Sequence, residues 1–147
     1  MPNQFNTQLG YFQGFLNAQI GFEIADQDSW TTITPVITDN AEFQYNTSLD
    51  TNTIVLEEKG LWRIDVIATF QGSTNDDMRF CAYTTESGEL PEIKWNARGG
   101  NNWAISYTAM YQFQKANNKV SFKVQNNDDA GATITMAYGI FTAIRLY

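Results

Sequence analysis

The stretch LWRIDVIATFQ, residues 61–71, decides the fold class of this chain. Its apolar residues recur at every second position: Trp62, Ile64, Val66, Ala68 and Phe70. Most of the positions between them carry polar side chains, although Ile67 is an exception. Because successive side chains of a β-strand point to opposite faces of a sheet, the pattern predicts a long strand with one face in a core.

The same period of two recurs along the rest of the chain. It is present in residues 20–24, 78–84, 103–113 and 120–124, whereas residues 46–52 have the composition of a turn-rich loop. No long helical pattern and no internal repeat interrupts these segments. Roughly eight to ten short strands with turn signals every ~8–12 residues predict an all-β sandwich or jelly roll. A chain of 147 residues has the length of one domain.

The last segment, residues 132–147, is apolar on both of its predicted faces. One face offers Ile134, Met136, Tyr138, Ile140, Ile144 and Leu146, and the other offers Ala137, Gly139, Phe141, Ala143 and Tyr147. A strand that is buried on both faces needs two partner layers. One layer is the core of its own domain, and we expect the second to be another subunit.

Residues 1–16 differ in pattern from the remainder, residues 17–147. Phe5, Leu9, Phe12 and Leu16 recur at roughly helical spacing but are interrupted by glycines, and Phe15 lies on the other side of this pattern. We interpret this segment as an N-terminal arm that becomes ordered against a partner, with these five residues as the anchor. The alternative is a first strand or strap on the domain itself.

Charge and hydropathy exclude several classes of partner. The net charge is -7, only 17% of the residues are charged, and no run of Lys or Arg is present. This balance argues against nucleic acid and against anionic membranes as partners. No apolar stretch is long enough to span a bilayer. The N-terminus lacks the features of an export signal, so we expect synthesis in a cytoplasm.

The residue inventory argues against an enzyme. The chain has no histidine and one cysteine, Cys81, which excludes Ser-His-Asp and Cys-His catalysis and any zinc site with His ligands. Cys81 lies in an apolar stretch, which predicts a buried and inert thiol. The adjacent Glu57 and Glu58 would point to opposite faces of a strand, so they do not form a catalytic pair.

Two groups of residues are weaker candidates for ligand sites. Oxygen ligands for calcium are offered by Asp76, Asp77, Asp128 and Asp129. Ordinary turn chemistry explains the same residues, and we favour that interpretation, with no cofactor required. Trp95 and Trp103 flank a glycine-rich turn, where exposed indoles would stack on a sugar or anchor a partner. The alternation over residues 103–113 favours burial instead.

Four segments together resemble the C1q/TNF-like jelly-roll family. They are NAEFQYN at residues 40–46, NTIVLEEKGLWRIDVIATF at 52–70, NKVSFKVQNNDDAGATI at 118–134 and YGIFTAIRLY at 138–147. The resemblance covers about residues 17–147 and implies a homotrimer in which the closing strand lies near the axis. The interface residues that we expect on this basis are Tyr111, Phe113, Tyr138, Phe141, Ala143 and Tyr147.

Two non-enzymatic roles fit a small trimer with a short arm. The first is a bacteriophage virion protein that decorates the capsid, binds the major capsid protein through the arm and stabilises the shell. The second is the receptor- or glycan-binding tip of a tail fibre or spike. A secreted C1q/TNF-like ligand is a weaker alternative, since no export signal is found. The first role places the protein on the virion surface.

Overall fold

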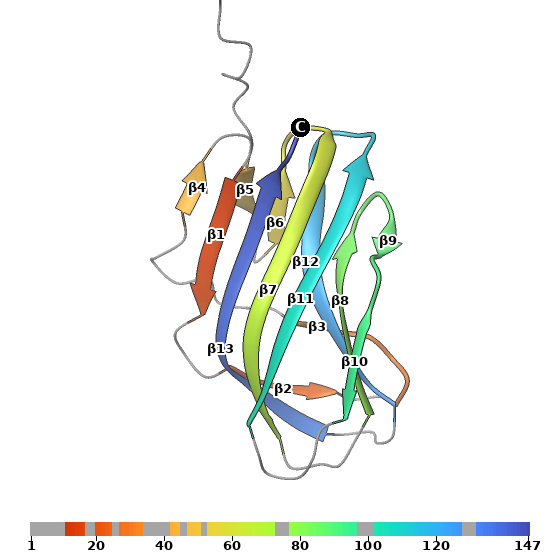
Figure 1. The fold of residues 1–147 in the computed structure, drawn as a ribbon. Coiled ribbons are helices and arrows are strands. Elements are labelled where there is room, and N and C mark those ends of the chain that lie inside the picture. The colour runs from red at the N-terminus through yellow and green to blue at the C-terminus, as the bar shows by residue number, and fades with distance from the viewer. Residues whose placement is uncertain are drawn as a thin grey trace, which may run out of the picture.

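The protein, described here by a computed structural model, is a sandwich of two β-sheets (Figure 1). The structure describes residues 11–16, 20–24, 27–33, 42–44, 47–50, 53–72, 77–96, 102–127 and 132–147. Within those ranges every regular element is a strand, which confirms the all-β prediction. None of the described residues forms a helix that is long and apolar enough to cross a bilayer.

The front sheet, which faces the viewer in Figure 1, has the strand order β11-β7-β13-β1-β4, and β2 pairs with β13. Its strands are β1 (Tyr11–Leu16), β2 (Ile20–Ile24), β4 (Glu42–Gln44), β7 (Gly60–Gly72), β11 (Asn102–Phe113) and β13 (Ala132–Arg145). All of its pairings are antiparallel. The decisive stretch of the sequence is therefore β7, which is hydrogen-bonded on both sides.

The back sheet lies behind it with the order β10-β8-β12-β6-β5, while β3 pairs with β12 and β9 with β8. Its strands are β3 (Thr31–Ile33), β5 (Thr47–Asp50), β6 (Thr53–Leu56), β8 (Asp77–Thr84), β9 (Gly88–Glu89), β10 (Ile93–Asn96) and β12 (Asn118–Asn126). Residues 47–50 were expected in a loop, and that prediction was wrong. They form the strand β5 because residues 53–56 offer it a hydrogen-bonding partner.

The core between the sheets is held by a continuous line of aromatic rings. Tyr107 of β11 meets Phe80 of β8 edge-on with ring centroids 5.2 Å apart. Phe80 stacks with Phe122 of β12 at 6.1 Å, and Phe122 contacts Phe141 of β13 at 4.8 Å. Offset and edge-on ring pairs contribute about 0.5–1.5 kcal/mol beyond area burial. The line therefore joins front sheet to back sheet at both ends.

Tyr107 also bridges the sheets by a hydrogen bond. Its hydroxyl accepts from the backbone N–H of Ala82 in β8 over 3.0 Å. The Ala82 carbonyl accepts from the N–H of Leu90 on the same side of the strand. Ala82 lies between the residues that pair with β10 and those that pair with β9. The phenol thus satisfies a buried donor where the ladder is interrupted.

Residues 1–16 are divided by the structure. Residues 11–16 form β1, which is hydrogen-bonded to β13 and β4 inside the front sheet. For residues 11–16 the structure thus shows the alternative to an arm, a strand that belongs to the domain itself. Residues 1–10 lie outside the described residues, so the arm remains a prediction for Phe5 and Leu9.

Candidate assembly face and ligand pocket

The outer face of the front sheet carries apolar side chains that are exposed to solvent. Ile67 of β7 is 54% exposed, Met110 of β11 is 56% exposed and Tyr138 of β13 is 41% exposed. Half-buried Ile140 and Ile144 of β13 share this face, since their register partners on β7 are Ile67 and Arg63. We call this set of five apolar side chains the assembly face.

A β-bulge explains which residues of β13 reach the assembly face. The register between β13 and β7 shifts between Met136 and Tyr138, so one extra residue is inserted there. Ile134 and Met136 before the bulge are buried in the core, and so is Phe141 beyond it. Regular alternation would have kept Ile140 on the face of Ile134. That expectation was wrong, because the inserted residue changes the phase of the strand.

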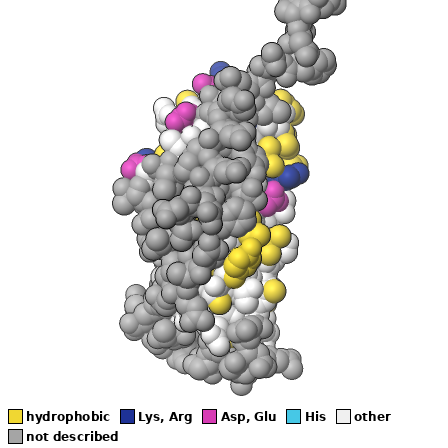
Figure 2. Space-filling view, turned by 90° about the vertical axis from the view of Figure 1, so that its left-hand side faces the viewer, with side chains coloured by type: hydrophobic (Ala, Val, Ile, Leu, Met, Phe, Trp, Pro, Cys, Tyr) yellow, Lys and Arg dark blue, Asp and Glu magenta, His cyan; other side chains and the backbone are white. Residues whose placement is uncertain are grey.

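A charged pair interrupts the assembly face. Arg63 Nε donates to Asp65 Oδ2 over 2.8 Å, and Thr108 Oγ1 donates to Asp65 Oδ1 over 2.7 Å. Figure 2, which views the molecule from its side, shows apolar side chains in two groups with basic and acidic side chains between them. Both oxygens of Asp65 are therefore satisfied within one chain, and the pair stands partly exposed between the apolar groups.

The residues expected at a trimer interface differ in exposure and fall into three groups. Tyr138 lies on the assembly face, and Tyr147 is 72% exposed just beyond the end of β13. Phe113, Phe141 and Ala143 instead lie in the core of a single chain with at most 1% exposure. Tyr111 is half-buried, and its ring centroid lies 4.8 Å from that of Phe113.

The sequence interpretation missed Ile67 and Met110. A signal was present for Ile67, because it is the one apolar residue among positions 63, 65, 67 and 69, which alternate with the buried positions 62–70. Met110 lies on the same outer face in β11, where its neighbours along the strand are Ala104, Ser106, Thr108 and Gln112. An apolar residue on the polar side of an alternating strand is a useful marker of a second buried surface.

The proposed anchor residues receive no side-chain description. Phe5 and Leu9 lie outside the described residues. Phe12, Phe15 and Leu16 belong to β1, where the backbone register places Phe15 opposite Ile140 of β13.

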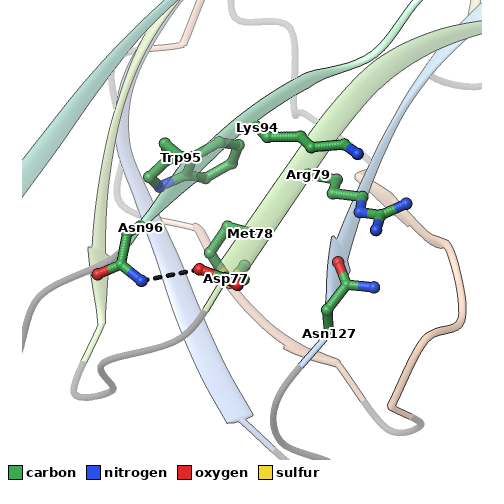
Figure 3. A pocket seen from close by; sticks show the side chains of 7 residues that line it. All are labelled: Asp77, Met78, Arg79, Lys94, Trp95, Asn96 and Asn127. Atoms are coloured by element: carbon green, nitrogen blue, oxygen red, sulfur yellow. Dashed lines mark hydrogen bonds between the residues drawn. The ribbon is translucent and has the colours of Figure 1, made fainter.

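The described residues also enclose a pocket at the edge of the back sheet, with a volume of about 400 Å³ (Figure 3). It lies where β8 begins and β10 ends, at the opposite end of the sandwich from Tyr147 (Figure 1). Trp95, one of the two expected ligand-binding indoles, lines it. Trp103 is half-buried against the core and does not line the pocket.

Among the residues that the structure describes, no three Asp, Glu, His or Cys side chains lie together in a way that could hold a metal ion. Asp77 lines the pocket, and its Oδ1 accepts from Asn96 Nδ2 over 2.8 Å. Asp76, Asp128 and Asp129 lie outside the described residues.

Burial raises two pKa values, both away from this pocket. The pKa of the Cys81 thiol rises to about 12 because burial removes its solvation and Glu89 adds a negative charge nearby. The pKa of Tyr107 also rises to about 12, mainly through burial. Both shifts keep the groups neutral, which suits a packed interior and not a reactive nucleophile.

The fold defines a class before any comparison is made: a two-sheet antiparallel jelly roll with an apolar outer face on one sheet. Solved structures with a similar fold belong to C1q and TNF proteins. The globular domain of zebrafish complement 1qA protein is similar, with a TM-score of 0.64 and 12% identity over 94% of this chain and 97% of that chain. Murine APRIL gives a TM-score of 0.66 at 10% identity over 95% of this chain and 100% of that chain.

A third similar structure is Eiger TNF from S. frugiperda, with a TM-score of 0.55 at 12% identity over 95% of this chain and 92% of that chain. No protein-family model matches the sequence, and no curated protein matches it significantly. At these identities the likeness establishes the fold alone. The chain has a C1q/TNF-like jelly-roll fold, as the sequence resemblance predicted.

Proposed function

We propose that the protein is a non-enzymatic module that works as a homotrimer, with its subunits joined through the assembly face. The observation that carries the proposal is the distribution of exposed apolar side chains. Among the described residues, the large hydrophobics with the greatest exposure are Ile67, Met110, Tyr138 and Tyr147. Three lie on the adjacent strands β11, β7 and β13 of the front sheet, and the fourth lies just beyond the end of β13.

The back sheet provides the contrast. Lys123 of β12 lies 3.7 Å from the ring centroid of Tyr83, and Lys119 Nζ contacts Asp50 Oδ2 at 2.6 Å. Its outer face is thus covered by cationic side chains that have partners within the chain. Exposed apolar side chains on one sheet, against lysines with partners within the chain on the other, favour the front sheet as the contact surface.

The resemblance to the C1q/TNF-like family supports a trimeric state, and this geometry suits one. A threefold axis brings three identical faces together in a closed ring. Arg63 and Asp65 would then be buried as a pair whose carboxylate is already hydrogen-bonded. Such a pair contributes little net stability but penalises any arrangement that leaves one charge without its partner.

Light scattering on the purified chain tests the assembly. We expect the mass of three chains for the wild type and of one chain for Ile67→Asp, which would bury three carboxylates around the axis. The matched control is Thr32→Asp, an equally acidic change at an exposed position of β3 in the back sheet. Retained far-UV circular dichroism separates dissociation from unfolding. A monomeric wild type, or a trimeric Ile67→Asp variant, would contradict the proposal.

For the biological role we propose a structural protein of a bacteriophage virion, bound to the capsid surface as a decoration protein. A surface poor in charge, with 17% charged residues in total and a net charge of -7, supports a module that binds protein and avoids nucleic acid. Binding to the assembled shell and not to free coat protein would stabilise the shell by mass action.

Immunogold labelling of particles from the source culture tests this role. Labels distributed over the capsid, together with a lower melting temperature of capsids that lack the protein, are the expected results. Labels confined to a tail tip would support the receptor-binding alternative. Protein that never cosediments with particles would overturn both virion roles.

A further inference from the structure

The pocket beside β8 and β10 contains a buried hydrogen-bond acceptor for which the described residues offer no donor. Asn127 Oδ1 is shielded from solvent and has no partner, although Asn127 lines the pocket. A buried polar atom without a partner costs about 1–3 kcal/mol. Such an atom in the wall of a cavity is satisfied either by a water or by a ligand group that donates to it.

The orientation of Asn127 is fixed by its neighbours. Its Nδ2 donates to Asp28 Oδ1 over 2.8 Å and to Gln125 Oε1 over 3.4 Å. Its backbone carbonyl accepts from Gln27 Nε2 over 2.7 Å, and its backbone N–H donates to the Asp77 carbonyl over 2.9 Å. Because the side-chain nitrogen of Asn127 is the atom that faces Asp28 Oδ1 and Gln125 Oε1, its side-chain oxygen has no hydrogen-bond donor among the described residues. Figure 3 shows that oxygen directed toward Arg79.

Two cations on the same side of the pocket share one carboxylate. Arg79 Nη1 lies 3.4 Å and Lys94 Nζ lies 3.2 Å from the same oxygen, Glu92 Oε1. Lys94 remains 61% exposed and Arg79 34% exposed. The single negative charge of Glu92 does not neutralise both cations. A second carboxylate, supplied by a ligand, would therefore be attracted to the Arg79 and Lys94 pair.

The opposite side of the pocket combines apolar side chains with one polar pair and is held rigidly by the core. Trp95 and Met78 form this wall together with the hydrogen-bonded pair of Asp77 and Asn96 (Figure 3). The Trp95 indole stacks on Phe70 with centroids 6.0 Å apart and an angle of 27° between the rings. Contact with the core therefore fixes the indole before any ligand arrives, which lowers the entropic cost of binding.

We propose that this pocket binds an acidic monosaccharide, a sugar ring that bears a carboxylate. The carboxylate contacts Arg79 and Lys94, a ring hydroxyl donates to Asn127 Oδ1, and the apolar C–H groups of the ring pack against Trp95. A volume of about 400 Å³ accommodates one such ring. A neutral sugar would leave the cations unused, and a simple carboxylate would leave Asn127 Oδ1 unsatisfied.

The inference goes beyond the proposed assembly and does not depend on it. All the groups involved belong to one chain, and β10 is an edge strand of the back sheet. The dissociated Ile67→Asp variant is therefore expected to bind the sugar as the wild type does. Failure of sugar binding and failure of trimerisation are separately visible.

Amide and indole NMR spectra of the ¹⁵N-labelled protein, titrated with glucuronate and with N-acetylneuraminate, provide the test. We expect one of them to shift the indole N–H signal of Trp95, identified by its loss in Trp95→Phe, with a Kd on the order of 1 mM. Arg79→Gln and Lys94→Gln should each weaken binding by about tenfold. The control Lys115→Gln removes an exposed lysine outside the pocket and should leave the affinity unchanged.

Glucose and acetate complete the design. Glucose that binds as tightly as the acids, or affinity that survives both substitutions, would overturn the role of the cations. Acetate that matches the sugar acids would reduce the site to a simple anion contact and overturn the sugar assignment. Absence of any shift with either acid would overturn the pocket as a sugar site, and retained spectral dispersion would show that each variant is folded.

Discussion

Gly60, at the start of β7, occupies a backbone conformation and a space that no larger residue shares. Its φ is +135°, and a Cβ built there would lie 2.4 Å from the backbone oxygen of Tyr147. That same oxygen accepts from the N–H of Leu61 over 2.8 Å, while the N–H of Leu146 donates to the Leu61 carbonyl over 2.7 Å. The glycine thus lets the end of the chain close against β7.

We expect Gly60→Ala to lower the free energy of unfolding by about 2–3 kcal/mol, from backbone strain and displacement of Tyr147. Gly88→Ala is the matched control. Gly88 also has a positive φ of +74°, but a Cβ there meets nothing closer than 3.9 Å. The free energy of unfolding of the control should fall by only about 1 kcal/mol, which is the cost of placing an alanine at a positive φ. Equal losses in urea unfolding would contradict the role given to the close approach.

The buried Cys81 thiol predicts how stability responds to alkali. Its pKa rises from 9.0 to about 12, first through burial and then through Glu89. The unfolded chain therefore releases this proton more readily, so the stabilisation is complete below pH 9 and is lost as pH rises toward 12. The pKa of Tyr107 rises from 10.0 to about 12. Its stabilising contribution is therefore also lost as the pH rises, but at higher pH than that of Cys81.

We expect Cys81→Ala to flatten the fall in stability between pH 9 and 10, before Tyr107 contributes. Urea unfolding of the wild type and the variant across this range measures the difference. Thr32→Ala, an exposed substitution on β3, is the control and should retain the wild-type slope. Identical slopes for the wild type and Cys81→Ala would show that the thiol does not titrate differently in the two states.

At the scale of the element, β13 depends on one inserted residue. Met136 pairs with Phe70 and Tyr138 pairs with the preceding residue of β7, Thr69, so Ala137 has no partner position of its own. The bulge allows Ile134 and Met136 to face the core before it, and Phe141 and Ala143 after it.

Deletion of Ala137 should be tolerated, because it joins two segments whose pairing with β7 is already continuous. We expect a folded protein that loses less than about 2 kcal/mol, mainly from altered twist at the former bulge. Deletion of Thr142 is the control, since it lies within regular pairing and would turn Ala143 outward and Ile144 inward. A lower melting temperature for the Ala137 deletion than for the Thr142 deletion would contradict the register.

The sequence predicted side-chain burial correctly where regular alternation alone determines it, and incorrectly where a bulge or strand pairing acts against the local pattern. The alternation over β7 predicted every buried residue from Trp62 to Phe70 because no irregularity interrupts it. In β13 the same rule misplaced Phe141 and Ile140, since a bulge has no composition signature. In β5 the Asn, Asp, Ser and Thr residues of the segment 46–52 indicate a turn, but pairing with β6 overrides local preference. The pocket joins residues from three strand ends, a proximity that spacing along the chain does not contain.

At the scale of the whole molecule, the assembly face and the pocket occupy different sheets. The front sheet presents Ile67 and Met110 outward, while the pocket opens beside β10 at the edge of the back sheet. A trimer joined through the front sheet therefore leaves three pockets outside the contact. Such an arrangement would bind a multivalent glycan more tightly than any single site does.

If folding and assembly are coupled, the melting temperature should depend on protein concentration. For three chains that unfold and separate together, a tenfold increase in concentration adds roughly 0.9 kcal/mol per chain. With an unfolding entropy of about 2.1 cal/mol/K per residue, this corresponds to a rise of about 3 °C for 147 residues. Differential scanning calorimetry at several concentrations measures the shift. The Ile67→Asp variant should melt at a temperature that concentration does not change, whereas Thr32→Asp should follow the wild type. A wild-type melting temperature without concentration dependence would mean that the chain is stable without its neighbours, and that contacts through the assembly face add nothing to the stability of the fold.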